Sequence, residues 1–293
     1  MPRILDLDRN QLSALRGRSL TDAVAAAEGR TLAAEVIPAA PVLVDGIENF
    51  ELVAAHGADL IILNFIELVW GDEGWRFPVL GPLADLAQLA QIVGRPIGVN
   101  LEPGDVPAPR RATVENARRL IDAGAAMLCL TANPGTGTTF DDLGRVTTEL
   151  RRALGSDAAV WVGKMHQAGH TEKITPDALA RLVDAGADGV LVPLPGTVPG
   201  VTRELATELC AAIHDRGAIV MGTVGTSQEG ARPAIAQQLA LLAKEIGVDV
   251  HHLGDAGLGR VTDPDLLYEY SIAMRGRRHT WRRMALGGRF LTH

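Results

Sequence analysis

The stretch "RLVDAGADGVLVP", residues 181–193, combines the end of a helix, a glycine and a short apolar run. Its first half has the spacing of an amphipathic helix, and Gly186 stands where a left-handed residue commonly ends a helix. The second half is a continuous run of aliphatic residues, which is typical of a parallel strand covered by helices. The segment therefore predicts one helix-to-strand step of a parallel sheet.

The same pattern occurs in "ELVAAHGADLIILN" (51–64), "RLIDAGAAMLCLTA" (119–132) and "LLAKEIGVDVHHLG" (241–254). Aliphatic runs of this kind recur about every 30 residues, which is the size of one βα unit. Eight candidate strands result, at 33–38, 59–65, 96–102, 126–132, 159–165, 189–194, 218–224 and 248–254. They predict an α/β protein with a closed (β/α)8 TIM barrel. An open doubly wound sheet is the alternative, but no glycine-rich dinucleotide fingerprint follows the first strand, and we expect no cofactor.

Both ends of the chain extend beyond the predicted barrel. We interpret residues 1–293 as one barrel domain, with a helical extension over 1–32 that plugs or flanks the barrel bottom and a C-terminal helical tail over 263–293. The stretch "RGRRHTWRRMALGGR" (275–289) holds six arginines and no acid, although the net charge is -7. Apolar residues among the arginines favour a subunit interface, and hence a homo-oligomer, over a solvated helix or an anion clamp: Trp281, Met284, Leu286 and Phe290.

Composition limits the class of protein. With 47% hydrophobic and 22% charged residues the chain resembles a soluble globular protein, and a pI near 5.6 argues against nucleic-acid binding. No stretch approaches the ~18 uninterrupted apolar residues of a membrane helix, and the start lacks the apolar core of a signal peptide. We therefore expect a cytoplasmic protein that binds neither nucleic acid nor membrane.

The stretch "AVWVGKMHQAGH" (159–170) passes from a buried strand to basic residues, and Lys164 is one of only three lysines in the chain. Since side chains alternate along a strand, we expect Trp161 and Met165 to lie under helices, and Lys164 and His166 to point toward the barrel mouth. A buried lysine amine can act as a nucleophile or carry a proton. The alternative is a structural ion pair between Lys164 and Glu102.

The same alternation places further polar side chains at the carboxyl ends of the strands, where enzymes of this fold carry their sites. Glu102 and Asn100 share the inward face of their strand with Gly98, and Asn64, Thr131 and Asn133 end two neighbouring strands. We predict Lys164, Glu102 and His166 as catalytic residues. The substrate oxygens would be held by Asn64, Asn100, Thr131 and Asn133.

Two glycine-rich turns, "MGTVGTSQEG" (221–230) and "LGDAGLGR" (253–260), follow the last two predicted strands. In this layout the chain resembles the phosphate-binding (β/α)8-barrel enzymes, which include sugar-phosphate isomerases, epimerases and lyases. The resemblance implies an anion site built by Gly222, Gly225, Thr226, Ser227, Gly254 and Gly257, with Asp255 beside it. Asp255 departs from the pattern because a carboxylate repels phosphate, so it would bind a substrate hydroxyl, orient His252 or hold a cation instead.

The segment "DPDLLYEYSIAMRGRRHTWRRMA" (263–285) resembles an uncharacterised barrel family whose members often carry hydrolase or phosphonomutase labels. The leading hypothesis is a lyase or isomerase, similar to an aldolase or epimerase, that acts on a small anionic carbonyl compound such as a sugar phosphate or keto acid. Lys164 would form a Schiff base or transfer a proton. One alternative is a non-catalytic barrel that binds a partner. Another is a metal-dependent hydrolase that uses Glu102, His166, His170, His252 and Asp255.

Overall fold

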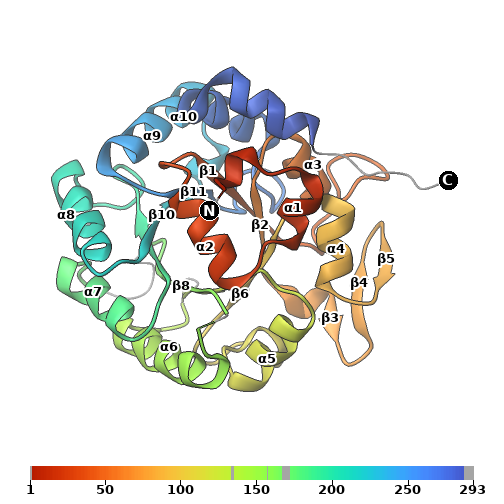
Figure 1. Cartoon of the computed structure of the whole chain (residues 1–293), viewed down its shortest axis with the longest axis horizontal. Helices are drawn as coiled ribbons and strands as arrows, with labels where there is room; N and C mark the ends of the chain where they lie inside the picture. The colour runs from red at the N-terminus through yellow and green to blue at the C-terminus, as the bar shows by residue number, and fades with distance from the viewer. Residues whose placement is uncertain (1, 133–134, 157, 167–171, 287–293) are drawn as a thin grey trace.

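The computed structural model describes residues 2–132, 135–156, 158–166 and 172–286, and its eight parallel strands close into a barrel (Figure 1). Around the barrel the order is β1-β11-β10-β9-β8-β7-β6-β2. Each strand overlaps one of the predicted ranges, so the TIM-barrel prediction is confirmed. The strands are β1 (Thr31–Val36), β2 (Leu60–Leu63), β6 (Ile97–Leu101), β7 (Met127–Leu130), β8 (Val160–Gly163), β9 (Gly189–Pro193), β10 (Ile219–Val224) and β11 (Val250–Leu253).

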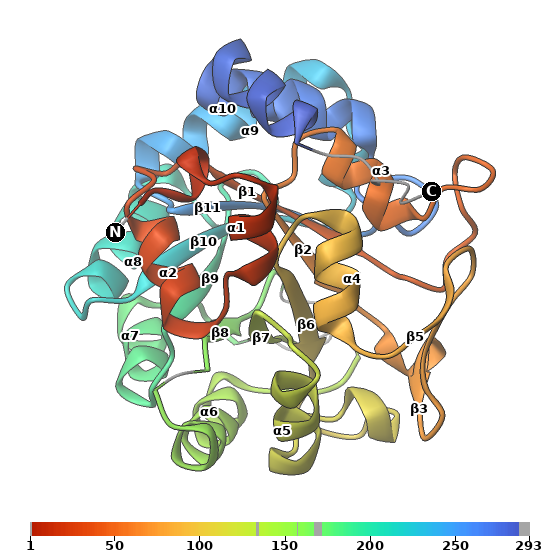
Figure 2. The same cartoon turned by 45° about the vertical axis from the view of Figure 1, so that its right-hand side comes forward.

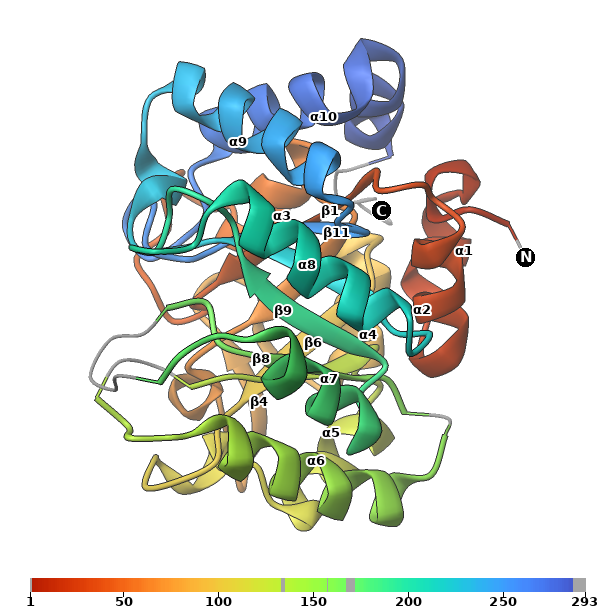
Figure 3. The same cartoon turned by 90° about the vertical axis from the view of Figure 1, so that its left-hand side faces the viewer.

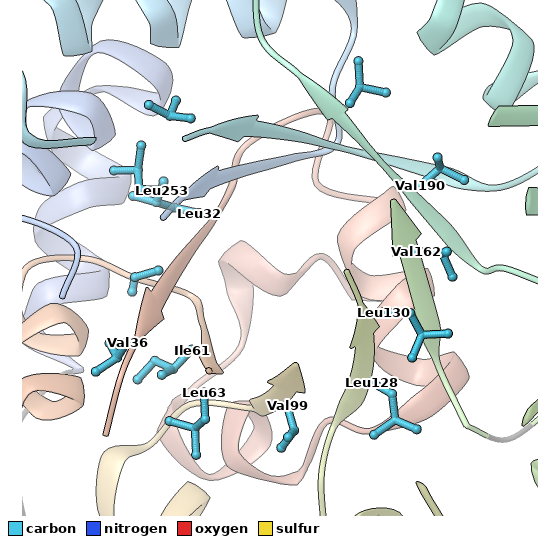
Figure 4. Packing of buried hydrophobic residues seen from close by; sticks show 14 of the residues in the cluster. Leu32, Val36, Ile61, Leu63, Val99, Leu128, Leu130, Val162, Val190 and Leu253 are labelled. Carbon is cyan, nitrogen blue, oxygen red and sulfur yellow. The ribbon is translucent and has the colours of Figure 1, made fainter. Parts of the chain in front are cut away.

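Helices form a ring outside the strands (Figure 1). Threonine side chains accept backbone N–H groups at the starts of several of them, as Thr175 and Thr202 do for α7 and α8. Aliphatic residues on the outer faces of the strands pack under the helices, among them Leu128, Val162 and Val190 (Figure 4). The helices are α3 (Asn49–Ala55), α4 (Leu86–Val93), α5 (Val114–Asp122), α6 (Phe140–Leu154), α7 (Pro176–Asp184), α8 (Arg203–His214), α9 (Pro233–Ile246) and α10 (Pro264–Ala285).

The N-terminal segment covers one end of the barrel. It contains η1 (Ile4–Asp6), α1 (Arg9–Ala14) and α2 (Gly17–Ala25), which lie together at one end of the molecule (Figure 3). Leu12 and Leu20 are fully buried and belong to the same apolar cluster as Leu60 and Val250, which begin their strands. The extension therefore closes the amino-terminal end of the barrel, and the carboxyl ends of the strands remain for the site.

The orientation of β8 differs from the prediction. Trp161 belongs to the cluster inside the barrel and Met165 packs against it, whereas Val160 and Val162 pack under the helices. The prediction assumed that the bulkiest side chains lie outside. The interior accepts Trp161 because β9 offers a glycine beside it: a Cβ on Gly189 would lie 3.0 Å from the indole. The prediction for Trp161 and Met165 is therefore wrong.

An antiparallel sheet lies outside the barrel beside α4 (Figure 2). Its strands β3 (Trp70–Gly71), β4 (Gly74–Phe77) and β5 (Gly81–Leu83) follow the short helix η2 (Ile66–Leu68). Trp75 stacks between Trp70 and Phe77, with ring centroids 5.5 and 6.0 Å apart. This sheet was not predicted, because its strands are too short to show an alternation of apolar and polar residues.

The arginine-rich tail folds back onto the barrel as part of α10. Arg275 and Arg283 are buried, and both pair with the carboxylate of Asp59, which is itself fully buried. The single carboxylate of Asp59 therefore offsets one of these two positive charges within the chain. Trp281 is 54% exposed, which leaves apolar area for the predicted subunit interface, and the homo-oligomer stays a prediction. Phe290 lies outside the described residues.

Candidate active site

A cavity of about 290 Å³ lies at the carboxyl ends of the strands, at the end of the barrel away from α1 and α2. It contains seven of the predicted site residues and four that were not predicted, Glu35, Met165, Glu229 and Ala256. The predicted residues that line it are Asn64, His166, Gly225, Thr226, Ser227, Gly254 and Asp255.

Asp255 ends a chain of hydrogen bonds that crosses the barrel mouth. The Thr131 hydroxyl donates to Asn100 Oδ1 at 2.7 Å, and the Asn100 amide donates to Asn64 Oδ1 at 2.9 Å. The Asn64 amide in turn donates to Asp255 Oδ2 at 3.1 Å. Every donor points the same way, toward the carboxylate. The structure thus brings together four predicted residues from the ends of β7, β6, β2 and β11 and fixes the carboxylate of Asp255.

The environment of Asp255 raises its pKa to about 7. Burial is the largest cause, and the negative charge of Glu35 adds to it. The hydrogen bond from Asn64 acts in the opposite direction, as do His252 and Arg260. The carboxyl of Asp255 can therefore gain and lose a proton near neutral pH.

Glu35 is the second carboxyl of the cavity, and it lies on the inward face of β1 with 2% of its surface exposed. Burial, followed by the charges of Glu229 and Glu102, raises its pKa to about 8. Its Oε2 lies 3.2 Å from Nε2 of His252, without the alignment of a hydrogen bond. Burial lowers the pKa of His252 to about 4, so a neutral imidazole faces a mostly protonated Glu35 at pH 7.

Glu229 is the third carboxyl, and it comes from the short helix η4 (Gln228–Gly230). Its Oε1 accepts the backbone N–H of Ala256 at 3.3 Å. A Cβ on Gly254 would lie 2.8 Å from Oε1, and one on Gly257 would lie 2.7 Å from the Glu229 carbonyl oxygen. These two glycines therefore make room for Glu229. Its carboxyl group occupies the place between the two glycine-rich turns where a bound substrate anion was predicted.

The turn after β10 forms the rim of the cavity. Thr226 and Ser227 both have left-handed backbone conformations, with φ of 59° and 72°, which are uncommon for residues other than glycine. The Thr226 hydroxyl donates to the Thr197 carbonyl at 2.6 Å and so holds the turn. Gly222 differs from the prediction: a Cβ there would lie 2.6 Å from Val248, so Gly222 serves the packing under the helices.

Lys164 does not line the cavity, and its predicted direction toward the barrel mouth is wrong. Its ammonium lies 2.6 Å from Glu172 Oε2 and 4.8 Å above the ring of Phe140, at the start of α6. Glu172 also accepts the backbone N–H of Phe140. Because Val162 and Lys164 share one face of β8, the inversion that puts Trp161 inside turns Lys164 toward α6.

Glu102 and His166 have different surroundings. Glu102 is fully buried, and its carboxylate lies 3.0 Å from the guanidinium of Arg110. The same guanidinium lies 3.0 Å from the carboxylate of Glu67, and neither contact has the alignment of a hydrogen bond. The alternative ion pair between Lys164 and Glu102 is therefore replaced by two separate pairs. His166 lines the cavity, and its pKa is lowered by burial and by the charge of Lys164.

Glu35 and Glu229 were missed. Glu35 is the only charged residue of the strand "TLAAEV", and the alternation rule applied there would have found it, since Leu32, Ala34 and Val36 pack outward. Glu229 lies in a turn, and no sequence period points to it. Asn133 and His170 lie outside the described residues. Within the described ranges, no three His, Cys, Asp or Glu side chains are placed to hold a metal ion.

Together, the fold and the cavity define a TIM-barrel protein with a carboxylate-lined cavity where enzymes of this fold carry their sites. The chain belongs to the family described as Domain of unknown function (DUF7916), whose model matches residues 5–289. No curated protein matches it. No helix in the described part of the chain is both long enough and apolar enough to span a bilayer.

Several solved structures share the fold at low identity. A protein of Coccidioides immitis with a provisional assignment as fructose-1,6-biphosphate aldolase has a TM-score of 0.56 at 15% identity, over 94% of this chain and 97% of that one. For 2,3-dimethylmalate lyase, a member of the PEP mutase/isocitrate lyase superfamily, the TM-score is 0.53 at 18% identity, over 92% and 94%. For oxaloacetate acetylhydrolase it is 0.54 at 14% identity, over 86% and 83%. These likenesses establish the fold.

Replacing Lys164 with methionine is expected to lower the free energy of unfolding by roughly 2 kcal/mol, because a charged hydrogen bond to Glu172 is lost. Catalytic activity should stay within a few fold of the wild type, since the side chain lies outside the cavity. Urea denaturation and turnover measurements check the two parts. A folded variant without activity would restore Lys164 as a catalytic residue, and a borohydride-trapped adduct on the wild type would show the Schiff base.

Replacing Glu35 with glutamine is expected to stabilise the protein at pH 8 and to change little at pH 4. The pKa of Glu35 is about 8 when folded and near the ordinary 4.5 when unfolded, so the folded state holds an extra proton between these values. The free energy of unfolding of the wild type therefore falls as pH rises through this window, and the variant should gain on the order of 3 kcal/mol at pH 8. Urea denaturation at both pH values tests this, with the exposed Glu28→Gln as control. Equal pH dependence in the wild type and Glu35→Gln would contradict the assignment.

Proposed function

We propose that this chain is a lyase that acts on a small carbonyl compound, and that Asp255 moves a proton at the carbon next to the carbonyl. The observation that carries the proposal is the hydrogen-bond chain from Thr131 to Asp255, which ends at the cavity. A general base works best when its pKa lies near the working pH, and the pKa of Asp255 is about 7.

Glu35 supplies the complementary group. When its carboxyl is protonated it donates a hydrogen bond, and a carboxylic acid kept neutral in this way stabilises the oxygen of an enolate as charge develops there. In the exchange reaction the carbonyl compound loses a proton from carbon to Asp255, and the electron pair moves onto the carbonyl oxygen beside Glu35. In the cleavage reaction the β-hydroxyl of the substrate gives its proton to Asp255 and becomes the carbonyl of the leaving fragment. The electrons of the broken carbon–carbon bond form the same enolate, and Asp255 then gives the proton to its carbon.

The comparisons support the lyase class over other chemistry on this barrel. Structures that share the fold include a 2,3-dimethylmalate lyase and an oxaloacetate acetylhydrolase, together with proteins titled as fructose-1,6-bisphosphate aldolases. An isomerase would use the same proton transfer and is the second candidate. Schiff-base chemistry has less support, because Lys164 pairs with Glu172 away from the cavity.

The test is hydrogen–deuterium exchange at carbon. The purified chain is incubated in D2O with hydroxyacetone, and proton NMR follows the loss of the signals next to the carbonyl. Exchange above the buffer rate supports the proposal, because it requires proton abstraction without a second substrate. A protein that leaves hydroxyacetone, pyruvate and aminoacetone at the buffer rate would refute it.

A further inference from the structure

Met165 enters the cavity from the wall opposite Glu35. It follows β8, and the strand order β1-β11-β10-β9-β8 places β8 four positions from β1 in the ring of eight strands, directly across the barrel. Gly225 follows β10 and lines the cavity beside Met165. In a substrate whose carbonyl oxygen lies beside Glu35, a substituent on the far side of the carbonyl group is therefore directed toward Met165 and Gly225.

The fold does not require glycine at position 225. A Cβ there would lie 3.6 Å from the Cβ of Met165 and 3.8 Å from its carbonyl oxygen, and would meet nothing else within 4 Å among the described residues. These are ordinary van der Waals distances, and the backbone of Gly225 is not left-handed. At Gly254, by contrast, a Cβ would lie 2.8 Å from Glu229. Gly225 therefore leaves to the cavity a volume that a side chain could fill.

This part of the wall is apolar and carries no charge. The Met165 side chain packs against the apolar cluster inside the barrel, and a methionine adapts its shape to an alkyl group. Within the described part of the chain, none of the residues that line the cavity is lysine or arginine. A phosphate or carboxylate on the substituent would therefore have no cation to pair with, and desolvating it would be costly. An alkyl group has no such cost.

We propose that the substrate carries an uncharged alkyl group on its carbonyl carbon, and that Met165 and Gly225 bind this group. The carbonyl half of this substrate rests on the proposed function, whereas the alkyl half rests on the open volume beside Gly225. A methylene buried there strengthens binding about fourfold, which corresponds to about 0.8 kcal/mol per CH2. Gly225 thus sets the length of the ketone that the cavity accepts.

The experiment measures dissociation constants of the full chain at pH 7 by ligand-observed NMR titration. The probes are hydroxyacetone, 1-hydroxy-2-pentanone, which has two further methylenes, and 5-hydroxy-4-oxopentanoate, in which a carboxylate replaces the terminal methyl. We expect 1-hydroxy-2-pentanone to bind at least roughly tenfold more tightly than either of the others, because it alone buries the full alkyl chain without a charge.

Two substitutions test the residues. Gly225→Ala places a methyl group in the volume meant for the alkyl chain and should reduce the preference for the longer ketone to within about twofold. Met165→Gln keeps the length of the side chain but makes the wall polar, and should reduce the preference by roughly threefold or more. The matched control is Gly144→Ala, which adds a methyl group on α6, 3.9 Å from Leu182, and should keep the wild-type preference.

Equal dissociation constants for hydroxyacetone and 1-hydroxy-2-pentanone in the wild type would overturn the inference, as would tighter binding of the anion. A wild-type preference retained in both Gly225→Ala and Met165→Gln would also overturn it. If Gly225→Ala does not fold, as judged by circular dichroism, Met165→Gln alone decides the matter.

Exchange in D2O with the same ketones separates this inference from the proposed function. A preference for the longer ketone without exchange of any of them supports the alkyl site and refutes the lyase. Exchange of hydroxyacetone and 1-hydroxy-2-pentanone with equal dissociation constants does the reverse.

Discussion

Asp255→Asn should lower the rate of ketone proton exchange by roughly a thousandfold, within the range that a positioned general base contributes. Asparagine keeps the size of the side chain and an oxygen that can accept from Asn64, but it cannot take up a proton. The loss should therefore appear in turnover and not in folding. Proton NMR exchange rates of the wild type and the variant, compared at pH 8, measure it.

The matched control is Asp265→Asn, which removes an exposed carboxylate ten residues along the chain. It should exchange at the wild-type rate. If Asp255→Asn retains more than a third of the wild-type activity, the proton is moved by another group, and His166 and Glu35 become the next residues to test.

The largest effect on stability is expected at Asp59. Its carboxylate lies against the guanidinium groups of Arg275 and Arg283 and accepts the backbone N–H of Leu32 at 2.8 Å. Asp59→Asn would leave two buried arginines without a counter-charge, which is expected to cost about 3–5 kcal/mol or to prevent folding. Urea denaturation measures the loss.

Low pH should destabilise the wild type in the same way as the Asp59→Asn substitution. Burial would raise the pKa of Asp59, but the charges of Arg275 and Arg283 outweigh it and lower the pKa. The contribution of Asp59 is therefore present above the ordinary pKa of an aspartate and is lost as pH falls through the lowered value. Glu149→Gln, which removes an exposed pair with Arg145, should change stability by less than about 1 kcal/mol. Equal effects of the two variants would contradict the role of the buried cluster.

The sequence was sufficient for the barrel because each strand is aliphatic and follows a helix that a glycine ends. The inward faces of β2, β6 and β7 were also predicted, since Ile97, Val99 and Leu101 alternate cleanly with Asn100 and Gly98. In β8 the prediction was wrong, because it assumed that the bulkiest apolar side chains lie outside the barrel. The space that Gly189 leaves for Trp161 depends on the neighbouring strand, which a single strand cannot show.

The site was predicted where its residues end strands of the barrel or directly follow them. Asn64, Asn100, Thr131 and Asp255 end strands, so their position follows from the fold. Lys164 was predicted as catalytic because it ends a strand and lysine is rare in this chain, but its partner Glu172 lies in the segment between β8 and α7. Glu229 reaches the cavity from a turn whose path depends on the packing of Gly254 and Gly257. Tertiary contacts of this kind leave no period in the sequence.

The most direct test of the role of Asp255 is the pH dependence of ketone proton exchange in the wild type, Asn64→Leu and Lys164→Met. In the wild type the rate should rise as pH increases through about 7, because Asp255 must be ionised to accept a proton. Asn64→Leu removes a hydrogen bond that favours the carboxylate, so its midpoint should move to higher pH. Lys164→Met should keep the wild-type midpoint. A midpoint that stays the same in Asn64→Leu and shifts in Lys164→Met would contradict the role of Asp255.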